Sequence, residues 1–349
     1  MASTRKTAVV VCPGRGTYGK GELGYLARHH SHQKELMQMV DGYRREQDQP
    51  TISDLDQAPN YSLNLQGRGD HASPLIFTCA YADFLAIDQD EIEVVAVTGN
   101  SMGWYIALAC AGATSPKAAL HIVNTMGRLM QDEAPGGQLI YPVTDDNWQA
   151  VPGRREQLTE LVAFLNGKSD HELYLSIDLG GFLVFAGNNA AIGAMQKILP
   201  TEQDRFPMVL ANHAAFHCPL QAPIAQKARH TLEPELIHSP KVPLIDGRGR
   251  IWFPHATSPA SLWRYTLDAQ VVAPYDFTRA VQVAVREFVP DHVIVLGPGS
   301  SLGAPVAQSL IDISWRGMTS KETFQKRQKK APFLISMGFH DQRSAVVQN

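Results

Sequence analysis

The sequence contains few cysteines, and they form no recognisable site. Four occur among 349 residues, at Cys12, Cys79, Cys110 and Cys218. They form no C-x-x-C pair, and the cysteine and histidine positions show no metal-ligand spacing. Each cysteine lies among apolar or small residues. We therefore expect free thiols in a reducing cytoplasm, with no metal and no redox cofactor.

Long apolar runs are also missing. The apolar residues 7–12 follow Arg5 and Lys6, as in a secretory signal, but Pro13-Gly14 ends the run too early. No stretch of the sequence approaches the roughly 20 apolar residues that cross a bilayer. We expect a soluble, cytoplasmic protein that does not associate with a membrane.

Neither sign of charge is in large excess. The sequence has 31 Lys and Arg against 34 Asp and Glu, a net charge of −3, so no global basic field favours a nucleic acid or an anionic membrane. Hydrophobic residues make up 44% of the chain, which is enough for a large globular core. No internal repeat is visible.

The most informative stretch is residues 94–112. A β-branched apolar run ends in Gly99-Asn100-Ser101-Met102-Gly103, and a run of small and apolar residues without proline follows. This order predicts a buried strand, a sharp turn and a helix, with Ser101 exposed at the turn as a nucleophile. The backbone N–H of Met102 would then point toward a forming oxyanion. The alternative is an ordinary strand-to-helix turn that contains a serine.

Strands alternate with helices along most of the chain, which predicts an α/β fold. The core is expected to be a hydrolase-like, mainly parallel sheet with helices on both faces, built from residues 1–137 and 212–349. Residues 138–211 read as β-α-β-β-α-β and predict an inserted, ferredoxin-like subdomain. A cleft would lie between the two parts. A buried helix is expected to start at Pro74, and the polar, basic tail from about Ser314 is expected to be partly mobile.

Six short motifs occur in an order that resembles one known family, the malonyl-CoA:acyl-carrier-protein transacylases, which include the acyltransferase domains of polyketide and fatty-acid synthases. The resemblance covers about residues 7–310. The motifs are Pro13-Gly14-Arg15-Gly16, Gly99-Asn100-Ser101-Met102-Gly103, Met130-Gln131, Phe216-His217-Cys218-Pro219-Leu220, Gln270 four residues before Pro274, and Gly297-Pro298-Gly299.

The resemblance implies a role for each matching position. Ser101 would be the nucleophile and His217 the general base. In the family a backbone carbonyl orients this histidine, and the matching position is Gln270. The oxyanion would be bound by the backbone N–H groups of Met102 and Arg15. Without the family, His217 reads equally well as a packed histidine before a helix, and His213 is a nearby competitor that does not match the catalytic position.

The sequence departs from the family in the acyl pocket. The family's malonyl-type members carry an arginine that binds the free carboxylate of the acyl group, and the matching position is Met126. A carboxylate there would be desolvated without a partner, at a cost of several kcal/mol. Arg128 lies about 200° around the same helix and should face away. The residues expected to line an uncharged acyl pocket are Met126, Trp104 and Phe216.

Two further positions around the site differ from the family. Arg15 replaces a glutamine, and its side chain would contact a CoA phosphate or a pantetheine carbonyl or lie in solvent. Asn100 and Trp104 flank the elbow where His and Glu are usual.

The prediction is therefore an acyltransferase that moves a monocarboxylic acyl group through acyl-Ser101. The donor would be a CoA or carrier-protein thioester and the acceptor an acyl-carrier-protein thiol, in fatty-acid or polyketide biosynthesis. Acyl-CoA and an acyl carrier protein would be its partners, and it would act as a monomer without a cofactor.

Three alternatives remain open from sequence. The first is an editing acyl hydrolase that clears acyl groups from carrier proteins. The second is a malonyl-CoA transacylase with a relocated carboxylate-binding arginine. The third is a non-catalytic docking protein, against which the intact Ser101 and His217 argue.

Overall fold

The fold is built on β1, an apolar strand near the middle of a six-stranded sheet. A computed structural model describes residues 5–348. The sheet has the order β11-β10-β1-β2-β7-β8, and every pair except β7–β8 is parallel. Residues 8–12 of β1 are buried, since helices cover both faces of a parallel sheet. The strands are β1 (Lys6–Cys12), β2 (Ile92–Gly99), β7 (Leu244–Ile245), β8 (Ile251–Trp252), β10 (His292–Val295) and β11 (Leu334–Ser336).

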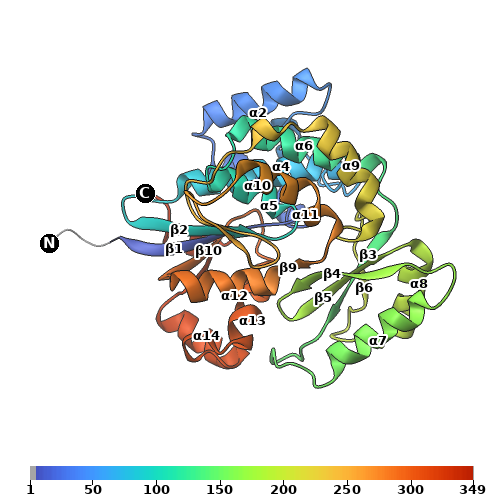
Figure 1. Ribbon diagram of the computed structural model, residues 1–349. Coiled ribbons are helices and arrows are strands. Elements are labelled where there is room, and N and C mark those ends of the chain that lie inside the picture. The colour runs from blue at the N-terminus through green and yellow to red at the C-terminus, as the bar shows by residue number, and fades with distance from the viewer. Residues whose placement is uncertain (1–4, 349) are drawn as a thin grey trace.

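Helices lie on both sides of this sheet. In Figure 1, α2, α4, α5 and α6 lie above it, and α12, α13 and α14 lie below it. No helix within residues 5–348 is long and apolar enough to span a bilayer. The helices of this part are α1 (Tyr25–His29), α2 (Lys34–Glu46), α3 (Ile52–Asp56), α4 (Gly69–Ala86), α5 (Gly103–Cys110), α6 (Pro116–Asp132), α9 (Ala222–Thr231), α10 (Pro259–Leu267), α11 (Ala269–Val272), α12 (Phe277–Phe288), α13 (Gly303–Asp312), α14 (Lys321–Lys330) and α15 (His340–Arg343).

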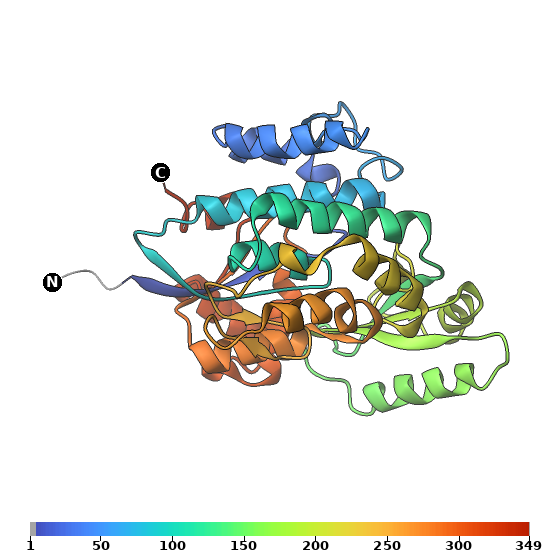
Figure 2. The same cartoon turned by 45° about the horizontal axis from the view of Figure 1, so that its top comes forward.

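A second, smaller sheet has the order β6-β3-β5-β4-β9. The chain segment from β3 to β6 has the element order β-α-β-β-α-β, and its helices α7 and α8 cover the outer side of this sheet (Figures 1 and 2). Alternate residues face opposite sides, so Leu183 and Phe185 pack in the cluster under the helices, while Phe182 and Val184 line a cavity toward the core. The elements are β3 (Gly137–Pro142), α7 (Arg154–Asn166), β4 (Leu173–Leu179), β5 (Phe182–Gly187), α8 (Asn189–Ile198), β6 (Met208–Val209) and β9 (Tyr275–Asp276).

This architecture confirms the predicted fold class of a parallel-sheet core with an inserted ferredoxin-like unit. The division at residues 138–211 stays a prediction. The fifth strand of the small sheet, β9, comes from the later core segment and pairs in parallel with β4. The two parts are therefore joined by backbone hydrogen bonds as well as by the chain.

One local prediction is wrong. α4 begins at Gly69 rather than at Pro74, which lies inside the helix. The carbonyl of Asp70, which would have accepted a hydrogen bond from residue 74, accepts one of 2.8 Å from Arg44 Nη1 instead. In the segment after Ser314, β11 pairs with β10 at the edge of the large sheet, and the expected partial mobility of this segment stays a prediction.

A buried ionic cluster fixes the end of the chain to the core. Asp83 Oδ1 accepts a hydrogen bond of 2.7 Å from His30 Nε2 and one from Arg343 Nη1, and the side chain of Asp83 is fully buried. Its Oδ2 accepts from the Tyr25 hydroxyl at 2.8 Å and from the backbone N–H of Gly297 at 2.7 Å. The cluster thereby joins α4, α15 and the loop after β10.

We predict that replacing Asp83 with alanine lowers the free energy of unfolding by about 3–5 kcal/mol, because Arg343 is left buried without its partner. Urea denaturation followed by circular dichroism measures this loss. The matched control is Asp90→Ala at an exposed position, which should change the value by less than about 0.5 kcal/mol. Equal losses in the two variants would contradict the structural role of the cluster.

Candidate active site

The turn after β2 holds Ser101 in an unusual backbone conformation. Its φ is 55°, in the left-handed region that non-glycine residues rarely adopt. The flanking glycines make room for this turn. A Cβ atom on Gly99 would lie 2.3 Å from the carbonyl oxygen of Gly103, and one on Gly103 would lie 2.4 Å from that of Cys12. This geometry is the strand-turn-helix elbow that the sequence predicts.

Ser101 and His217 are in direct contact, although 116 residues separate them. Ser101 Oγ lies 2.7 Å from His217 Nε2, and His217 Nδ1 lies 2.7 Å from the carbonyl oxygen of Gln270. A carbonyl oxygen only accepts hydrogen bonds, so Nδ1 carries the proton. Nε2 is then the acceptor for the serine hydroxyl.

The environment keeps His217 neutral. Burial lowers the pKa of its imidazole to about 4, and the hydrogen bond to Gln270 opposes this shift. Both polar atoms of the Gln270 side-chain amide are hydrogen-bonded as well. Gln270 Nε2 donates to the carbonyl oxygen of Ser101 at 3.1 Å, and its Oε1 accepts from the Tyr105 hydroxyl at 3.0 Å.

Two backbone N–H groups near Ser101 are available to a ligand. Those of Met102 and Arg15 find no protein acceptor within residues 5–348. Met102 is the N-cap residue of α5, where the helix dipole favours negative charge. Arg15 follows β1, and the preceding Gly14 packs so closely on Asn100 that a Cβ there would lie 2.8 Å from its carbonyl oxygen. The structure thus brings both predicted oxyanion donors next to the elbow.

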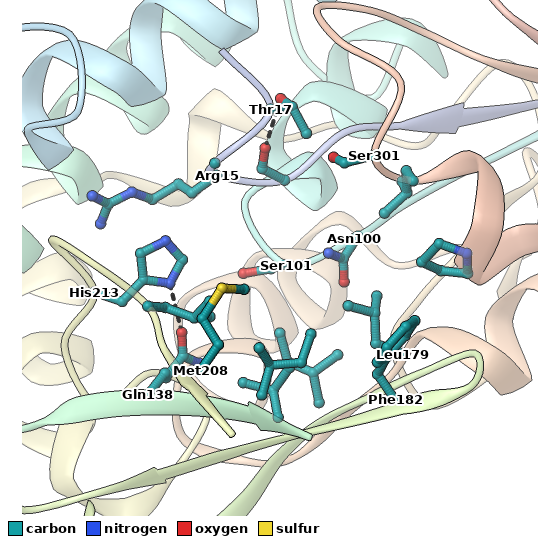
Figure 3. Close-up of a pocket in the computed structure, with 18 of the residues that line it drawn as sticks. Arg15, Thr17, Asn100, Ser101, Gln138, Leu179, Phe182, Met208, His213 and Ser301 are labelled. Atoms are coloured by element: carbon teal, nitrogen blue, oxygen red, sulfur yellow. Dashed lines mark hydrogen bonds between the residues drawn. The ribbon is translucent and has the colours of Figure 1, made fainter. Parts of the chain in front are cut away.

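The larger cavity beside Ser101 is mostly apolar. It has a volume of about 320 Å³ and lies between the loops at the carboxyl end of β1 and the inner face of the small sheet (Figure 3). Asn100, Ser101 and His213 form part of its polar edge. Its apolar wall includes Ile140, Ile177, Leu179, Phe182, Val184 and Met208.

A narrow second cavity, of about 20 Å³, lies on the α6 side of Ser101. Met126 and Phe216 line it, as the sequence predicts for the acyl pocket, together with Met102, His217 and Gln270.

The placement of Trp104 in the acyl pocket is wrong. This residue is completely buried and lines neither cavity. Its indole Nε1 donates to Thr266 Oγ1 at 3.0 Å, and its ring packs edge-on against Tyr265. Trp104 is three residues beyond Ser101, and α5 turns its side chain into the core.

A series of hydrogen bonds that sequence analysis missed lies beneath the site. His213 Nδ1 donates to Gln138 Oε1 at 2.8 Å, and Gln138 Nε2 donates to Ser176 Oγ at 2.7 Å. Ser176 in turn donates to the carbonyl oxygen of Phe216 at 2.8 Å, directly before His217. The sequence signal for these hydrogen bonds is Gln138, a polar residue within an otherwise apolar strand. The hydrogen bonds connect the small sheet to the segment that carries His217.

His213 itself presents a neutral acceptor to the larger cavity. Burial, with a contribution from Arg15, lowers the pKa of His213 to about 3. Its Nε2 has no protein partner within the described residues, and its ring lies beside Arg15 (Figure 3). No group of three or more metal-ligand side chains converges within residues 5–348.

Comparison with known proteins identifies distant relatives. No family model matches the chain. It is 26% identical over 218 residues to the malonyl CoA-acyl carrier protein transacylase of Haemophilus influenzae. The aligned residues cover 61% of this chain and 64% of that protein. It is 24% identical over 305 residues to the Salmonella typhimurium protein of the same name, covering 84% of this chain and 89% of that one. A third relative, 24% identical over 282 residues, is the mycoketide-CoA synthase of Mycobacterium tuberculosis, of which the match covers 6%.

Solved structures of the same group share the fold. FabD from Acinetobacter baumannii superposes with a TM-score of 0.73 at 20% identity, over 98% of this chain and 97% of that one. The malonyl-transacylase of the PlMCAT:AntF complex, in which it is bound to a type II polyketide acyl-carrier protein, gives a TM-score of 0.71 at 19% identity, over 98% of this chain and 99% of that one.

We predict that Gly103→Ala disrupts the elbow and lowers the free energy of unfolding by at least about 3 kcal/mol, because the added methyl group meets backbone atoms of Cys12 and Pro13. Gly193→Ala is the matched control. Gly193 lies within α8, and a Cβ there has no neighbour within 4 Å, so alanine should stabilise by about 0.5–1 kcal/mol. Chemical denaturation measures both changes, and a well-tolerated Gly103→Ala would contradict the close packing of the elbow.

Proposed function

We propose that this chain, a homologue of malonyl CoA-acyl carrier protein transacylases and of polyketide-synthase acyltransferase domains, transfers an acyl group through an acyl-Ser101 intermediate. The donor is a CoA or carrier-protein thioester, and the acceptor is the phosphopantetheine thiol of an acyl carrier protein. The observation that carries this proposal is the alignment of Ser101 Oγ, His217 Nε2 and the carbonyl oxygen of Gln270, at 2.7 Å for each contact.

In the first half-reaction, Ser101 Oγ attacks the thioester carbonyl while His217 Nε2 takes the hydroxyl proton. The oxyanion of the tetrahedral intermediate accepts hydrogen bonds from the backbone N–H groups of Met102 and Arg15. As the intermediate collapses, the carbon–sulfur bond breaks. The leaving thiolate receives the proton from His217, and the acyl group stays on Ser101.

In the second half-reaction, His217 accepts the proton of the incoming carrier thiol. The thiolate attacks the acyl-Ser101 ester, and the same two N–H groups bind the oxyanion. Collapse breaks the bond between the carbonyl carbon and Ser101 Oγ, and His217 returns the proton to the serine. The low pKa of His217 leaves Nε2 unprotonated at pH 7 and able to accept a proton, and it makes the protonated imidazole a strong acid toward the leaving group, while it weakens the imidazole as a base.

Several features support carrier-protein thioesters as substrates. The larger cavity is open at the cleft between the sheets and is mainly apolar, with polar groups near Ser101, which suits a pantetheine arm with its amides. The complex of a related transacylase with an acyl-carrier protein is consistent with such a partner. We further propose that the protein acts in fatty-acid or polyketide biosynthesis, in the cytoplasm and as a monomer, without a cofactor.

We predict that the intact mass of the protein rises by one acyl group after incubation with an acyl-CoA, and that a holo acyl carrier protein discharges this adduct. The panel of donors is malonyl-CoA, acetyl-CoA and octanoyl-CoA. Ser101→Ala should give no adduct and reduce turnover by at least about 10³-fold. Ser169→Ala, at an exposed serine in the small subdomain, should behave like the wild type.

Two other outcomes of this experiment would argue against a transferase. Thioester consumption that depends on Ser101 but needs no carrier protein would identify an acyl hydrolase instead of a transferase. Absence of both adduct and turnover with CoA and carrier-protein thioesters would contradict the proposed function.

A further inference from the structure

The inner face of the small sheet forms an apolar wall of the larger cavity. The polar side chain on this face is Gln138, and both ends of its amide already have hydrogen-bond partners, His213 and Ser176. A polar group of a substrate would therefore be desolvated along this wall without a new partner. The apolar side chains of the wall are Ile140, Ile177, Leu179, Phe182, Val184 and Met208.

Part of this wall is exposed inside the cavity, whereas the other face of the same sheet is packed under α7 and α8. Met208 is 39% exposed, and Ile140, Leu179 and Phe182 are half-buried. In Figure 3, Leu179, Phe182 and Met208 lie on the side of Ser101 that faces the strands of this sheet. Apolar surface left exposed in a concave site favours an apolar ligand there.

The opposite wall of the cavity comes from loops of the core and is polar. Thr17 and Ser301 lie on this side, across the nucleophile from the small sheet (Figure 3). The carboxamide of Asn100 lies beside them, and its Oδ1 has no hydrogen-bond partner within the described residues. The charged residues that line the cavity, Arg15 and Arg205, also come from loops. The amides of a pantetheine arm can thus find partners on this wall, away from the sheet.

The two cavities at Ser101 admit acyl groups of different length. The narrow one, lined by Met126 on α6, has about 20 Å³, which is room for roughly one group the size of a water molecule or a methyl. Arg128, on the same helix, is exposed and lines neither cavity. The larger cavity, of about 320 Å³, has room for roughly twenty such groups. An acyl chain longer than acetyl therefore has to enter the larger cavity.

Resting on the proposed function, we infer that the inner face of the small sheet binds the acyl chain, and that this chain is uncharged and of medium length. The thioester carbonyl stays at the backbone N–H groups of Met102 and Arg15. From there the chain runs along the apolar wall, while the pantetheine arm follows the polar loops. The inserted subdomain, and not Met126 on α6, then sets the length of the acyl group.

The test measures kcat/KM for transfer to a holo acyl carrier protein from acetyl-, butyryl-, octanoyl- and malonyl-CoA. We predict that octanoyl-CoA is used at least about 100-fold better than acetyl-CoA, because each added CH₂ group that leaves water for the wall contributes up to about fourfold. Butyryl-CoA should fall between the two. Malonyl-CoA should be used less well than octanoyl-CoA, because its carboxylate would lose its hydration against this wall.

Two neighbouring residues of β6 provide a matched pair of variants. Met208 pairs with Ile140 and lines the cavity, whereas Val209 pairs with Leu139, which packs in the cluster on the other face. The two residues are 39% and 41% exposed. Met208→Glu should lower the ratio of kcat/KM for octanoyl-CoA to that for acetyl-CoA by about 10-fold or more. Val209→Glu should leave this ratio within about threefold of the wild type.

A third variant tests the depth of the wall from inside. Val184 lines the cavity from β5 and is 1% exposed. The larger ring of Val184→Phe shortens the space for the chain, so the preferred donor should shift from octanoyl-CoA toward butyryl-CoA. The thermal midpoint of each variant, compared with that of the wild type, shows whether a loss common to all donors comes from unfolding.

The outcomes separate this inference from the proposed function. If no donor acylates the wild type, the proposed function fails and the inference fails with it. If Ser101 is acylated but acetyl-CoA or malonyl-CoA is used better than octanoyl-CoA, the proposed function stands and the inference is overturned. Equal changes of the octanoyl-to-acetyl ratio in Met208→Glu and Val209→Glu would also overturn it.

Discussion

The hydrogen bond from His217 Nδ1 to the backbone carbonyl of Gln270 is the constraint on which the site depends. It fixes which imidazole nitrogen carries the proton, and it aims the other nitrogen at Ser101. Because a carbonyl is neutral, it orients the imidazole without adding the negative charge that a carboxylate would bring. The side chain of Gln270 is hydrogen-bonded to Ser101 and Tyr105, so the elbow, His217 and Gln270 form one hydrogen-bonded unit.

Burial explains how charge is distributed around this unit. Both His213 and His217 are kept neutral by desolvation, and Arg15 is the charged group that reaches both cavities near Ser101. The apolar face of the small sheet and Met126 make the remaining walls, where a thioester and its pantetheine arm would contact hydrocarbon.

The elements that sequence predicts well are those with strong local signals. The strand-turn-helix at Ser101 and the β-α-β-β-α-β segment follow from apolar periodicity and glycine positions. The predictions for Trp104 and Pro74 are wrong because both depend on tertiary partners. Thr266 accepts the hydrogen bond of the buried indole of Trp104. Arg44 donates to the carbonyl oxygen of Asp70, which Pro74 leaves without its helical donor. The direction of the Arg15 side chain is likewise set by the carbonyls of Gly67 and Asn212, which are distant in sequence.

The protonation state of His217 tests the account most directly. Two-bond proton–nitrogen correlation NMR on protein labelled with ¹⁵N-histidine distinguishes the two tautomers, and His217→Gln assigns the signals. We predict a neutral ring with the proton on Nδ1 at pH 7, which becomes protonated with a pKa near 4. A proton on Nε2, or a pKa near the ordinary value of about 6.5, would contradict the proposed base and its orientation by Gln270.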